Sequence, residues 1–244
     1  MRYDVTGSGY SSSVKWSYDD LNNLTTQTHT LNGTTYTESY SYDDDNRLTG
    51  ITNGSVKSTY SYDVFSRMNT ITAKYGSTNV VTTTIGYKTP SNTATSAQVA
   101  TWKNVSSGLT RTYTYTYDIR GNITAISDGT NTTTYVYDGM DQLIRENNQA
   151  AGKTWTYTYD NGGNITSKKE YAYTTGTLGT ATNTISYAYG DSSWKDLLTS
   201  YNGQTITSDA IGNMLSDGTW TYTWQHGRQL AGMSKTGTTI SYET

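Results

Sequence analysis

Aromatic and small polar residues alternate strictly along several stretches of this chain. Residues 111–117 read RTYTYTY, which places the tyrosines on one side of an extended strand and the threonines on the other. Residues 155–159 (WTYTY) and 220–224 (WTYTW) repeat the arrangement. A period of two in aromatic and β-branched residues predicts half-exposed β-strands. The nearest candidate for a helix, residues 194–198, is very short.

One sequence motif recurs in register with this alternation. It consists of two aromatic residues with one residue between them, an aspartate, a loose turn, and then a polar and an aliphatic residue. Examples read YSYDDDNRL from Tyr40 and YTYDNGGNI from Tyr157. We predict that the second aromatic and the aspartate of each clear copy are structural repeat residues, because self-similarity at a fixed period indicates a repeat architecture. These residues are Tyr18 and Asp19, Tyr42 and Asp43, Tyr62 and Asp63, Tyr117 and Asp118, Tyr137 and Asp138, and Tyr159 and Asp160.

Weaker copies are expected at about residues 75–110 and 185–244. The long gap between Tyr62 and Tyr117 leaves room for degenerate copies near Tyr87 and Trp102. Two more follow late in the chain. One, around Asp209, has Ser208 in the aromatic position, and the other keeps Trp224 but has Gln225 in place of the aspartate.

Two kinds of turn separate the predicted strands. In the first, the aspartate side chain can accept backbone N–H groups two residues on, and Gly121, Gly162 and Gly163 would supply a positive φ. The second kind favours type I′ hairpins and occurs at Asn32-Gly33, Asn53-Gly54, Asp128-Gly129, Asn202-Gly203 and Asp217-Gly218.

Each unit of about 20 residues therefore gives two strands and two turns. The predicted fold is all-β, a long antiparallel β-hairpin meander of 18 to 24 strands that forms one domain over residues 1–244. An open twisted sheet rarely exceeds ten strands without curling. We therefore expect the meander to coil into a spiral or shell-like sheet.

Composition narrows the possible functions. The chain has 24 Tyr, one Phe, no Cys and 33% apolar residues, so burial must come mainly from aromatic rings. Its 17 basic and 20 acidic residues give a net charge of −3, without a basic cluster that would suit nucleic acid. No apolar run is long enough to span a membrane. The absence of cysteine leaves the redox compartment open.

The residues that could take part in catalysis or metal binding fit structural roles better. The two histidines, His29 and His226, lie far apart in the sequence and fit no metal or nucleophile–base spacing. Asp43–Asp45 and Asn46 have some character of a calcium loop but lack the EF-hand pattern. A catalytic aspartate is needed once, whereas a turn aspartate is needed in every repeat. We therefore predict no catalytic residues, no metal and no cofactor.

The recurrent motif resembles the YD repeat of bacterial Rhs proteins, of the cocoon subunits of Tc toxins and of animal teneurins. The resemblance covers Trp16 to Leu230. It implies a β-hairpin strip that spirals into a hollow shell, which in bacterial members encloses a C-terminal toxic polypeptide. Some members close the shell with an aspartyl autoprotease segment that carries a DPxG-like signature. The only proline here is Pro90, preceded by Thr89, so that activity is not carried over.

The resemblance implies a structural, non-catalytic segment of a shell in a bacterial secreted or surface protein. Its expected partners are other repeats of the same parent and an enclosed toxin or effector. The alternative is a carbohydrate- or surface-binding module that uses its rows of Tyr and Trp. An enzyme on a β-scaffold is a third possibility, but a nonrepeating acid pair was not found. Free strand edges invite pairing with other chains, so we also expect self-association.

Overall fold

The computed structural model describes residues 2–7, 9–89 and 96–242, and Pro90 lies outside them. Within these ranges the chain forms 23 strands. The first ten are β1 (Arg2–Gly7), β2 (Tyr10–Tyr18), β3 (Leu24–Leu31), β4 (Thr34–Tyr42), β5 (Leu48–Asn53), β6 (Val56–Tyr62), β7 (Met68–Tyr75), β8 (Thr78–Tyr87), β9 (Val99–Ser106) and β10 (Leu109–Tyr117). The next are β11 (Ile123–Ser127), β12 (Thr132–Tyr137), β13 (Leu143–Asn148), β14 (Lys153–Tyr159), β15 (Ile165–Ala172) and β16 (Asn183–Ala188). The last are β17 (Ser200–Tyr201), β18 (Gln204–Thr205), β19 (Thr207–Ser208), β20 (Met214–Ser216), β21 (Thr221–Gln225), β22 (Gln229–Lys235) and β23 (Thr238–Ser241).

The all-β antiparallel meander predicted from the sequence is confirmed. The described residues include no helix long and apolar enough to cross a bilayer. The chain divides into two compact units, Met1–Thr116 with Ile126–Thr130, and Tyr117–Ala125 with Asn131–Thr244. That the whole chain folds as one domain stays a prediction.

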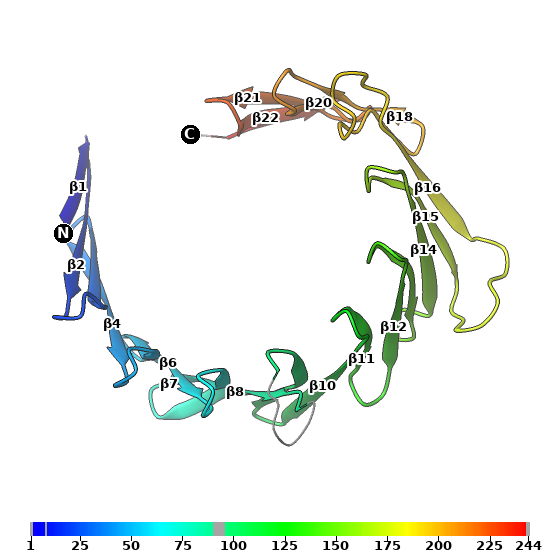
Figure 1. Cartoon of the computed structure of the whole chain (residues 1–244). Helices are drawn as coiled ribbons and strands as arrows, with labels where there is room; N and C mark the ends of the chain where they lie inside the picture. The colour runs from blue at the N-terminus through cyan, green and yellow to red at the C-terminus, as the bar shows by residue number, and fades with distance from the viewer. Residues whose placement is uncertain (1, 8, 90–95, 243–244) are drawn as a thin grey trace. The chain divides into compact units, whose positions relative to one another are not determined.

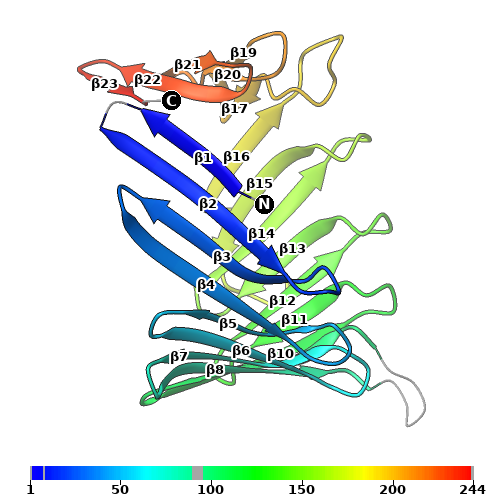
Figure 2. The same ribbon diagram turned by 90° about the vertical axis from the view of Figure 1, so that its left-hand side faces the viewer.

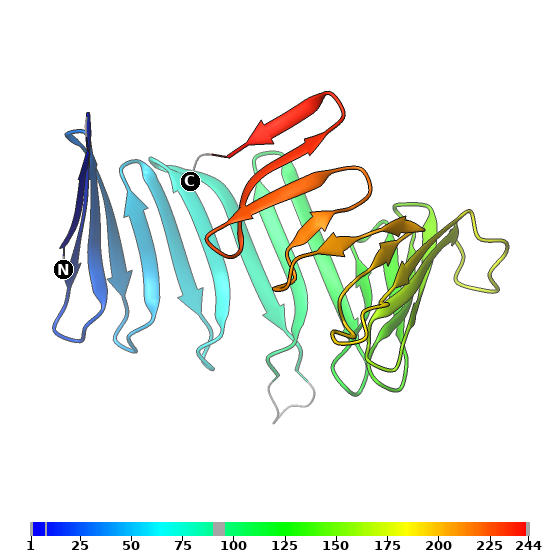
Figure 3. The same ribbon diagram turned by 90° about the horizontal axis from the view of Figure 1, so that it is seen from above.

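In the first unit, each strand from β1 to β10 pairs antiparallel with the next strand in the sequence. Figure 1 shows these strands, coloured blue to green, following one another along a curve, and Figure 3 shows them side by side in a single row. No second layer of strands covers either face within this unit (Figure 2). The first unit is therefore a single curved sheet.

In the second unit, too, each strand pairs with the next one in the sequence, and the strands form two sheets. Strands β12 to β18 pair in sequence order. Strands β19 to β23 form a five-stranded sheet of their own. All these pairs are antiparallel, as expected for strands joined by short hairpins.

The two faces of each sheet differ in chemistry because side chains alternate along a strand. On one face, which we name the aromatic face, Tyr60 lies opposite Ile71, and Trp102 lies opposite both Ile85 and Tyr113. The other face, the threonine face, carries rows of hydroxyl groups. One row joins Thr59, Thr72 and Thr82 across three strands, and another joins Thr28 and Thr37, with Lys15 opposite Thr28 on the next strand.

Very little of the chain is buried. The structure exposes 15679 Å², whereas a compact protein of 26.9 kDa exposes about 10,800 Å². Among the described residues, the only buried apolar side chains are Ile85 and Ile206. The fold therefore has no large apolar core, so hydrogen bonds and half-buried rings must contribute much of its stability.

The most buried polar groups lie on the threonine face of the second unit. Thr154 is fully buried and Asn147 is 4% exposed. The segment after β15 reaches these strands: the Arg145 guanidinium donates to the carbonyl oxygens of Thr174, at 2.7 Å, and Gly176, at 2.9 Å. The Thr154 hydroxyl accepts the N–H of Thr174 at 3.0 Å. This segment thus ties β15 to the two preceding strands.

Candidate functional site: the repeated tyrosine–aspartate turn

The aspartate of each repeat organises its own turn, as Asp160 illustrates. Its Oδ1 accepts the backbone N–H groups of Gly162 and Asn164, both at 2.9 Å. Its Oδ2 accepts the side-chain amide of Asn164 at 3.0 Å. The backbone closes the same loop, since the N–H of Asp160 donates to the carbonyl of Asn164 at 2.9 Å. One carboxylate therefore accepts three N–H groups within a five-residue turn.

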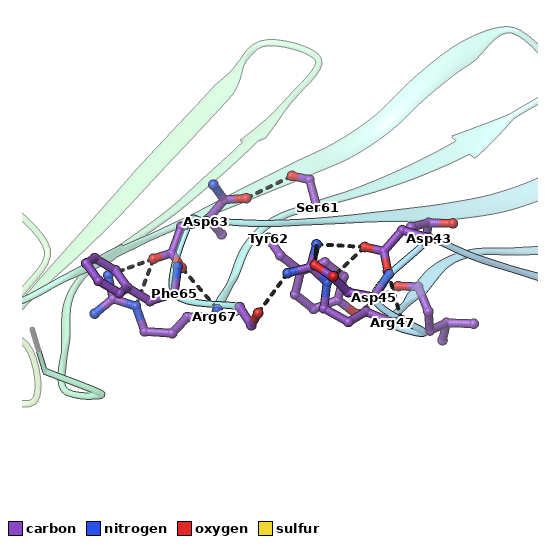
Figure 4. Close-up of polar contacts among 12 residues, drawn as sticks. Asp43, Asp45, Arg47, Ser61, Tyr62, Asp63, Phe65 and Arg67 are labelled. Atoms are coloured by element: carbon purple, nitrogen blue, oxygen red, sulfur yellow. Dashed lines mark hydrogen bonds and ion pairs between the residues drawn. The ribbon is translucent and has the colours of Figure 1, made fainter.

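The same contacts recur in the other turns. The aspartates that accept two backbone N–H groups and a side-chain donor four residues on are Asp19, Asp43, Asp63, Asp118, Asp160 and Asp209. Asp138 keeps the two backbone contacts, from Met140 and Gln142. Figure 4 shows the version in which arginine is the side-chain donor, with Arg47 on Asp43 and Arg67 on Asp63.

These hydrogen bonds act on the charged form of the carboxylate. Donation from the side chain of Asn164, followed by its backbone N–H, holds the pKa of Asp160 below its ordinary value. Donation from the Arg67 side chain has the same effect on the pKa of Asp63. A carboxylate that accepts several N–H groups is stabilised when ionised.

One residue in each turn has a left-handed backbone, and it is always the third after the aspartate. The seven residues are Asn22, Asn46, Ser66, Gly121, Asp141, Gly163 and Gly212, with φ values of 71°, 65°, 60°, 94°, 63°, 87° and 87°. The expectation of a positive φ is confirmed for Gly121 and Gly163 but is wrong for Gly162. The turn needs only one left-handed residue, and Gly162 instead donates its N–H to Asp160.

Replacing Gly163 with alanine is expected to destabilise the fold by about 1–2 kcal/mol, the usual cost of a left-handed L-residue. Replacing it with asparagine should cost less, since Asn22 and Asn46 adopt this conformation in other turns. Thermal unfolding of both variants measures the difference. The matched control is Gly139→Ala. Gly139 is outside the left-handed region, and a Cβ there would meet no atom within 4 Å. An equal loss in all three variants would contradict the argument.

In six places a tyrosine that precedes a turn bonds to the repeat before it. This tyrosine is the last residue before the turn, and the aliphatic residue after the turn lies opposite it, as Ile165 lies opposite Tyr159. The pairing register of the two strands shifts by one residue at this point. Its ring then reaches back, and its hydroxyl donates to the backbone carbonyl of the preceding repeat's aliphatic residue. The pairs are Tyr42 to Leu24 at 3.1 Å, Tyr62 to Leu48 at 2.8 Å, Tyr87 to Met68 at 2.7 Å, Tyr137 to Ile123 at 2.9 Å, Tyr159 to Leu143 at 2.7 Å and Tyr189 to Ile165 at 3.1 Å.

Replacing Tyr159 with phenylalanine tests this contact. The ring stays, but the hydrogen bond to the Leu143 carbonyl is lost. We expect a loss of about 1 kcal/mol, or about 2–4 °C in Tm for a protein of this size. Tyr36, which is 55% exposed, is the control, because water can solvate its hydroxyl. Equal effects of the two changes in thermal unfolding would refute a role for the Tyr159 hydroxyl.

A third contact joins several of the turns to the one after. In these turns the donor four residues after the aspartate reaches the left-handed residue of the next turn, whereas Arg67 donates to the Ser96 carbonyl and Asn164 to the Asp196 carboxylate. Asn122 donates to the Asp141 carboxylate at 2.8 Å, and Arg47 donates to the Ser66 hydroxyl at 2.9 Å (Figure 4). Asn23 and Asn46 form an equivalent contact. The guanidinium of Arg47 also lies 4.7 Å from the centre of the Tyr62 ring. Where both contacts occur, neighbouring repeats are joined at two places.

The degenerate copies show which parts of the repeat are separable. Asp209 builds a complete turn without an aromatic residue before it. Where Gln225 replaces the aspartate, the left-handed residues are instead His226 and Gly227, and Trp224 still donates its Nε1–H to the Met214 carbonyl at 2.7 Å. After Tyr87, the backbone N–H of Lys88 donates to the Gln98 carbonyl at 2.9 Å, whereas Trp102 lies within β9.

The aromatic face of the second unit holds a mixed cluster. The Lys168 ammonium lies 5.4 Å from the centre of the Trp155 ring and 5.8 Å from that of Tyr157. Burial, with a smaller contribution from Glu146, raises the pKa of Tyr157 to about 12. Among the described residues, no three His, Cys, Asp or Glu side chains gather as a metal-binding group. Of the residues weighed for such a site, His29 lies in β3, and Asp43 organises its turn.

These repeats match known protein families. The family model described as Teneurin YD-shell matches residues 55–192, and the one described as RHS Repeat matches residues 18–55. The chain belongs to the teneurin YD-shell family, and the resemblance seen in the sequence is confirmed. Its repeats are structural shell repeats. No curated protein matches the chain.

Several solved structures are similar. A crystal structure of TcdB2–TccC3–Cdc42 is 14% identical with a TM-score of 0.48, and one of TcdB2–TccC3 without its hypervariable C-terminal region is 16% identical with a TM-score of 0.49. Each match covers 91% of this chain, which spans only 15% of the length of either structure. A porin-like protein from Bacteroides uniformis is 16% identical with a TM-score of 0.35, covering 73% of this chain and 91% of that one.

Proposed function

We propose that this chain is a non-catalytic segment of a YD-repeat shell that encloses or presents a C-terminal toxin or effector in a bacterial secreted or surface protein. The observation that carries the proposal is the fastening of successive repeats. Six tyrosines bond to the preceding repeat, several turns bond to the following one, and the described residues contain few buried apolar side chains. Such an arrangement suits a thin extended wall better than a compact catalytic domain.

The two faces of the sheet support the same proposal. A wall around a polypeptide presents one surface to its contents and another to its surroundings. Here one face is rich in aromatic rings and the other in threonine hydroxyls. Tyrosine rings can contact apolar side chains and still leave a hydroxyl for water. The expected partners are other repeats of the parent protein and the enclosed polypeptide.

Protease protection of the natural polypeptide that contains this chain tests the proposal. With the wall folded, any polypeptide that follows it should resist digestion. After the wall is unfolded with guanidinium, the same polypeptide should be cleaved rapidly. The proposal is overturned if no such polypeptide exists, or if it is digested equally fast in both states.

The carbohydrate-binding alternative predicts a different result. Selective binding of one sugar on a glycan array, lost when Trp155 is replaced by alanine, would favour it. That replacement removes the half-buried ring that contacts Lys168. A shell segment predicts no such selectivity.

A further inference from the structure

Glu38 is the only acidic residue in strands β3 to β7, all of whose residues the structure describes. Its neighbour on the same face of β4, Tyr40, lies opposite Ile51, and Ile51 lies opposite Ser58, two residues before Tyr60. Glu38 therefore belongs to the aromatic face of the first unit. Because β4 is paired on both sides, with β3 and β5 (Figure 2), Glu38 lies within the sheet and not at its edge.

No lysine or arginine of strands β3 to β7, which are described in full, reaches the aromatic face. Lys57 and Lys74 lie opposite each other, two positions along from a pair in the threonine row, and so belong to the threonine face. His29, on the aromatic face of β3, contacts Gln27. Within the described ranges, Glu38 accordingly forms no ion pair.

A cleft, which we name the Glu38 cleft, lies beside this carboxylate. The carboxylate accepts the Tyr40 hydroxyl at 2.9 Å and, more distantly, the Asn53 side-chain amide at 3.4 Å. A carboxylate can accept about four hydrogen bonds, so acceptor capacity remains. The cleft has a volume of about 420 Å³, within the range of about 300–1,000 Å³ that is usual for ligand sites. Besides Glu38 and Asn53, its walls are formed by residues of β5 and β6, namely Ile51, Val56 and Ser58.

The second unit contains a similar glutamate whose cationic partner is part of the chain. Glu170 lies opposite Trp155 on one side and Asn183 on the other, just as the first unit pairs a glutamate with an asparagine. Its carboxylate forms an ion pair with the Lys153 ammonium and accepts the Trp155 Nε1–H at 3.3 Å. Donation from Lys153 holds the pKa of Glu170 below its ordinary value. The cavity beside Glu170 measures only about 80 Å³.

The two glutamates therefore differ in what neutralises their charge. Glu170 has Lys153, whereas the space beside Glu38 is an open cleft. A lysine side chain suits both parts of this cleft. Its methylene stem can pack against the apolar wall of Ile51 and Val56, and its ammonium can donate to the carboxylate.

We propose, on the basis of the proposed function, that the Glu38 cleft binds a lysine side chain of the polypeptide that the wall encloses. The contact joins one ammonium to one carboxylate and holds an extended segment of that polypeptide against the aromatic face. A charged contact of this kind fixes the position of the bound segment, whereas tyrosine rings accept many different side chains.

Titration of this chain with a lysine probe tests the site without the enclosed polypeptide. The probe is N-acetyl-lysine N′-methylamide. Its neutral counterpart is N-acetyl-norleucine N′-methylamide, which has the same stem without the ammonium. Chemical-shift changes of the Asn53 and Val56 amides should show binding of the lysine probe that is about fivefold tighter than that of the norleucine probe, the usual contribution of one partly exposed ion pair. Equal affinities overturn the proposal.

The Glu38→Gln variant removes the charge but keeps the shape of the side chain and an acceptor for the Tyr40 hydroxyl. It should weaken binding of the lysine probe about fivefold and leave binding of the norleucine probe unchanged. Glu170→Gln is the matched control and should have no effect, because Lys153 already occupies that carboxylate. Thermal unfolding verifies that both variants fold. An affinity for the lysine probe that Glu38→Gln leaves unchanged overturns the proposal.

The Lys153→Ala variant gives the reciprocal test. It frees the Glu170 carboxylate, so the variant should bind a second lysine probe and shift the Asn183 amide. Adding Glu170→Gln to this variant should abolish the second site and leave the first one intact. A Lys153→Ala variant that folds and binds only one probe overturns the proposal, because a glutamate on this face would then not be sufficient to hold a lysine.

Cross-linking in the natural polypeptide that contains this chain identifies the source of the lysine. A carbodiimide activates the Glu38 carboxylate, and attack by a lysine amine forms an amide as a urea leaves. Mass spectrometry should find Glu38 joined to a lysine of the enclosed polypeptide. Protease protection of the same sample reports the enclosure separately. A protected polypeptide without a Glu38 cross-link overturns the lysine site and leaves the wall in place, whereas a lack of protection overturns the enclosure itself.

Discussion

Replacing Asn147 with alanine is expected to lower the free energy of unfolding by about 3 kcal/mol and Tm by about 6–12 °C. The Asn147 side chain accepts from the Arg145 Nε–H at 2.7 Å and donates to the Thr134 hydroxyl at 2.8 Å. It also lies 3.2 Å from the Thr154 hydroxyl. The variant would leave a guanidinium N–H and a buried hydroxyl without these partners, which costs more than losing a solvated contact.

Asn183 on β16 provides the matched control. Its side chain is exposed, so the same change to alanine should alter the free energy of unfolding by less than about 0.5 kcal/mol. Thermal and urea unfolding of the two variants give the comparison. Similar losses in both would show that the cluster beneath the segment after β15 adds no stability of its own.

The parts of the fold that could be predicted from the sequence are those set by near neighbours. The alternation of tyrosine and threonine predicts the strands, because one face of the sheet is aromatic and the other carries hydroxyl groups, as in residues 111–117. The turn at Asp160 involves contacts only with residues up to Asn164. The recurrence of aspartate with a donor four residues later was therefore visible in the linear sequence.

The contacts between repeats were not visible in this way. The Tyr159 hydroxyl bonds a carbonyl 16 residues earlier, and any residue can supply a carbonyl. The left-handed position held by Ser66 and Asp141 was missed because neither residue signals a positive φ as glycine does. The burial of Thr154 depends on a segment around Thr174 that has no hydrophobic periodicity.

The copy around Asp209 shows that a repeat can be weak in sequence and still build the aspartate turn. Ser208 stands where the other repeats have an aromatic residue, so similarity to the consensus falls. The turn is nevertheless complete, because its geometry depends on Asp209 and Asn213 rather than on a ring. The aspartate turn and the aromatic contact are thus independent parts of the repeat, and one can form where the residues for the other are missing.

Acid is expected to unfold the protein through these same aspartates. The pKa is lowered from the ordinary value of 3.8 at Asp19, Asp43, Asp63, Asp118, Asp160 and Asp209. For a group whose folded pKa is depressed, the stabilisation is present above the unfolded value and is lost as pH falls through the folded value. Stability should therefore be nearly constant from pH 7 to about pH 5 and should fall steeply below about pH 4. Urea unfolding at a series of pH values measures this, and the slope gives the protons taken up on unfolding.

The Asp160→Asn variant separates the charge of the carboxylate from its shape. At pH 7 the variant should be less stable than the wild type, because a neutral amide accepts the N–H groups of Gly162 and Asn164 more weakly than a carboxylate does. As pH falls through the lowered pKa of Asp160, the wild-type carboxylate becomes protonated, so the two stability curves should converge. A stability difference that stays the same as pH falls until the wild type unfolds would mean that the turn depends on the shape of the side chain and not on its charge. In that case the acid sensitivity would have to arise elsewhere in the chain.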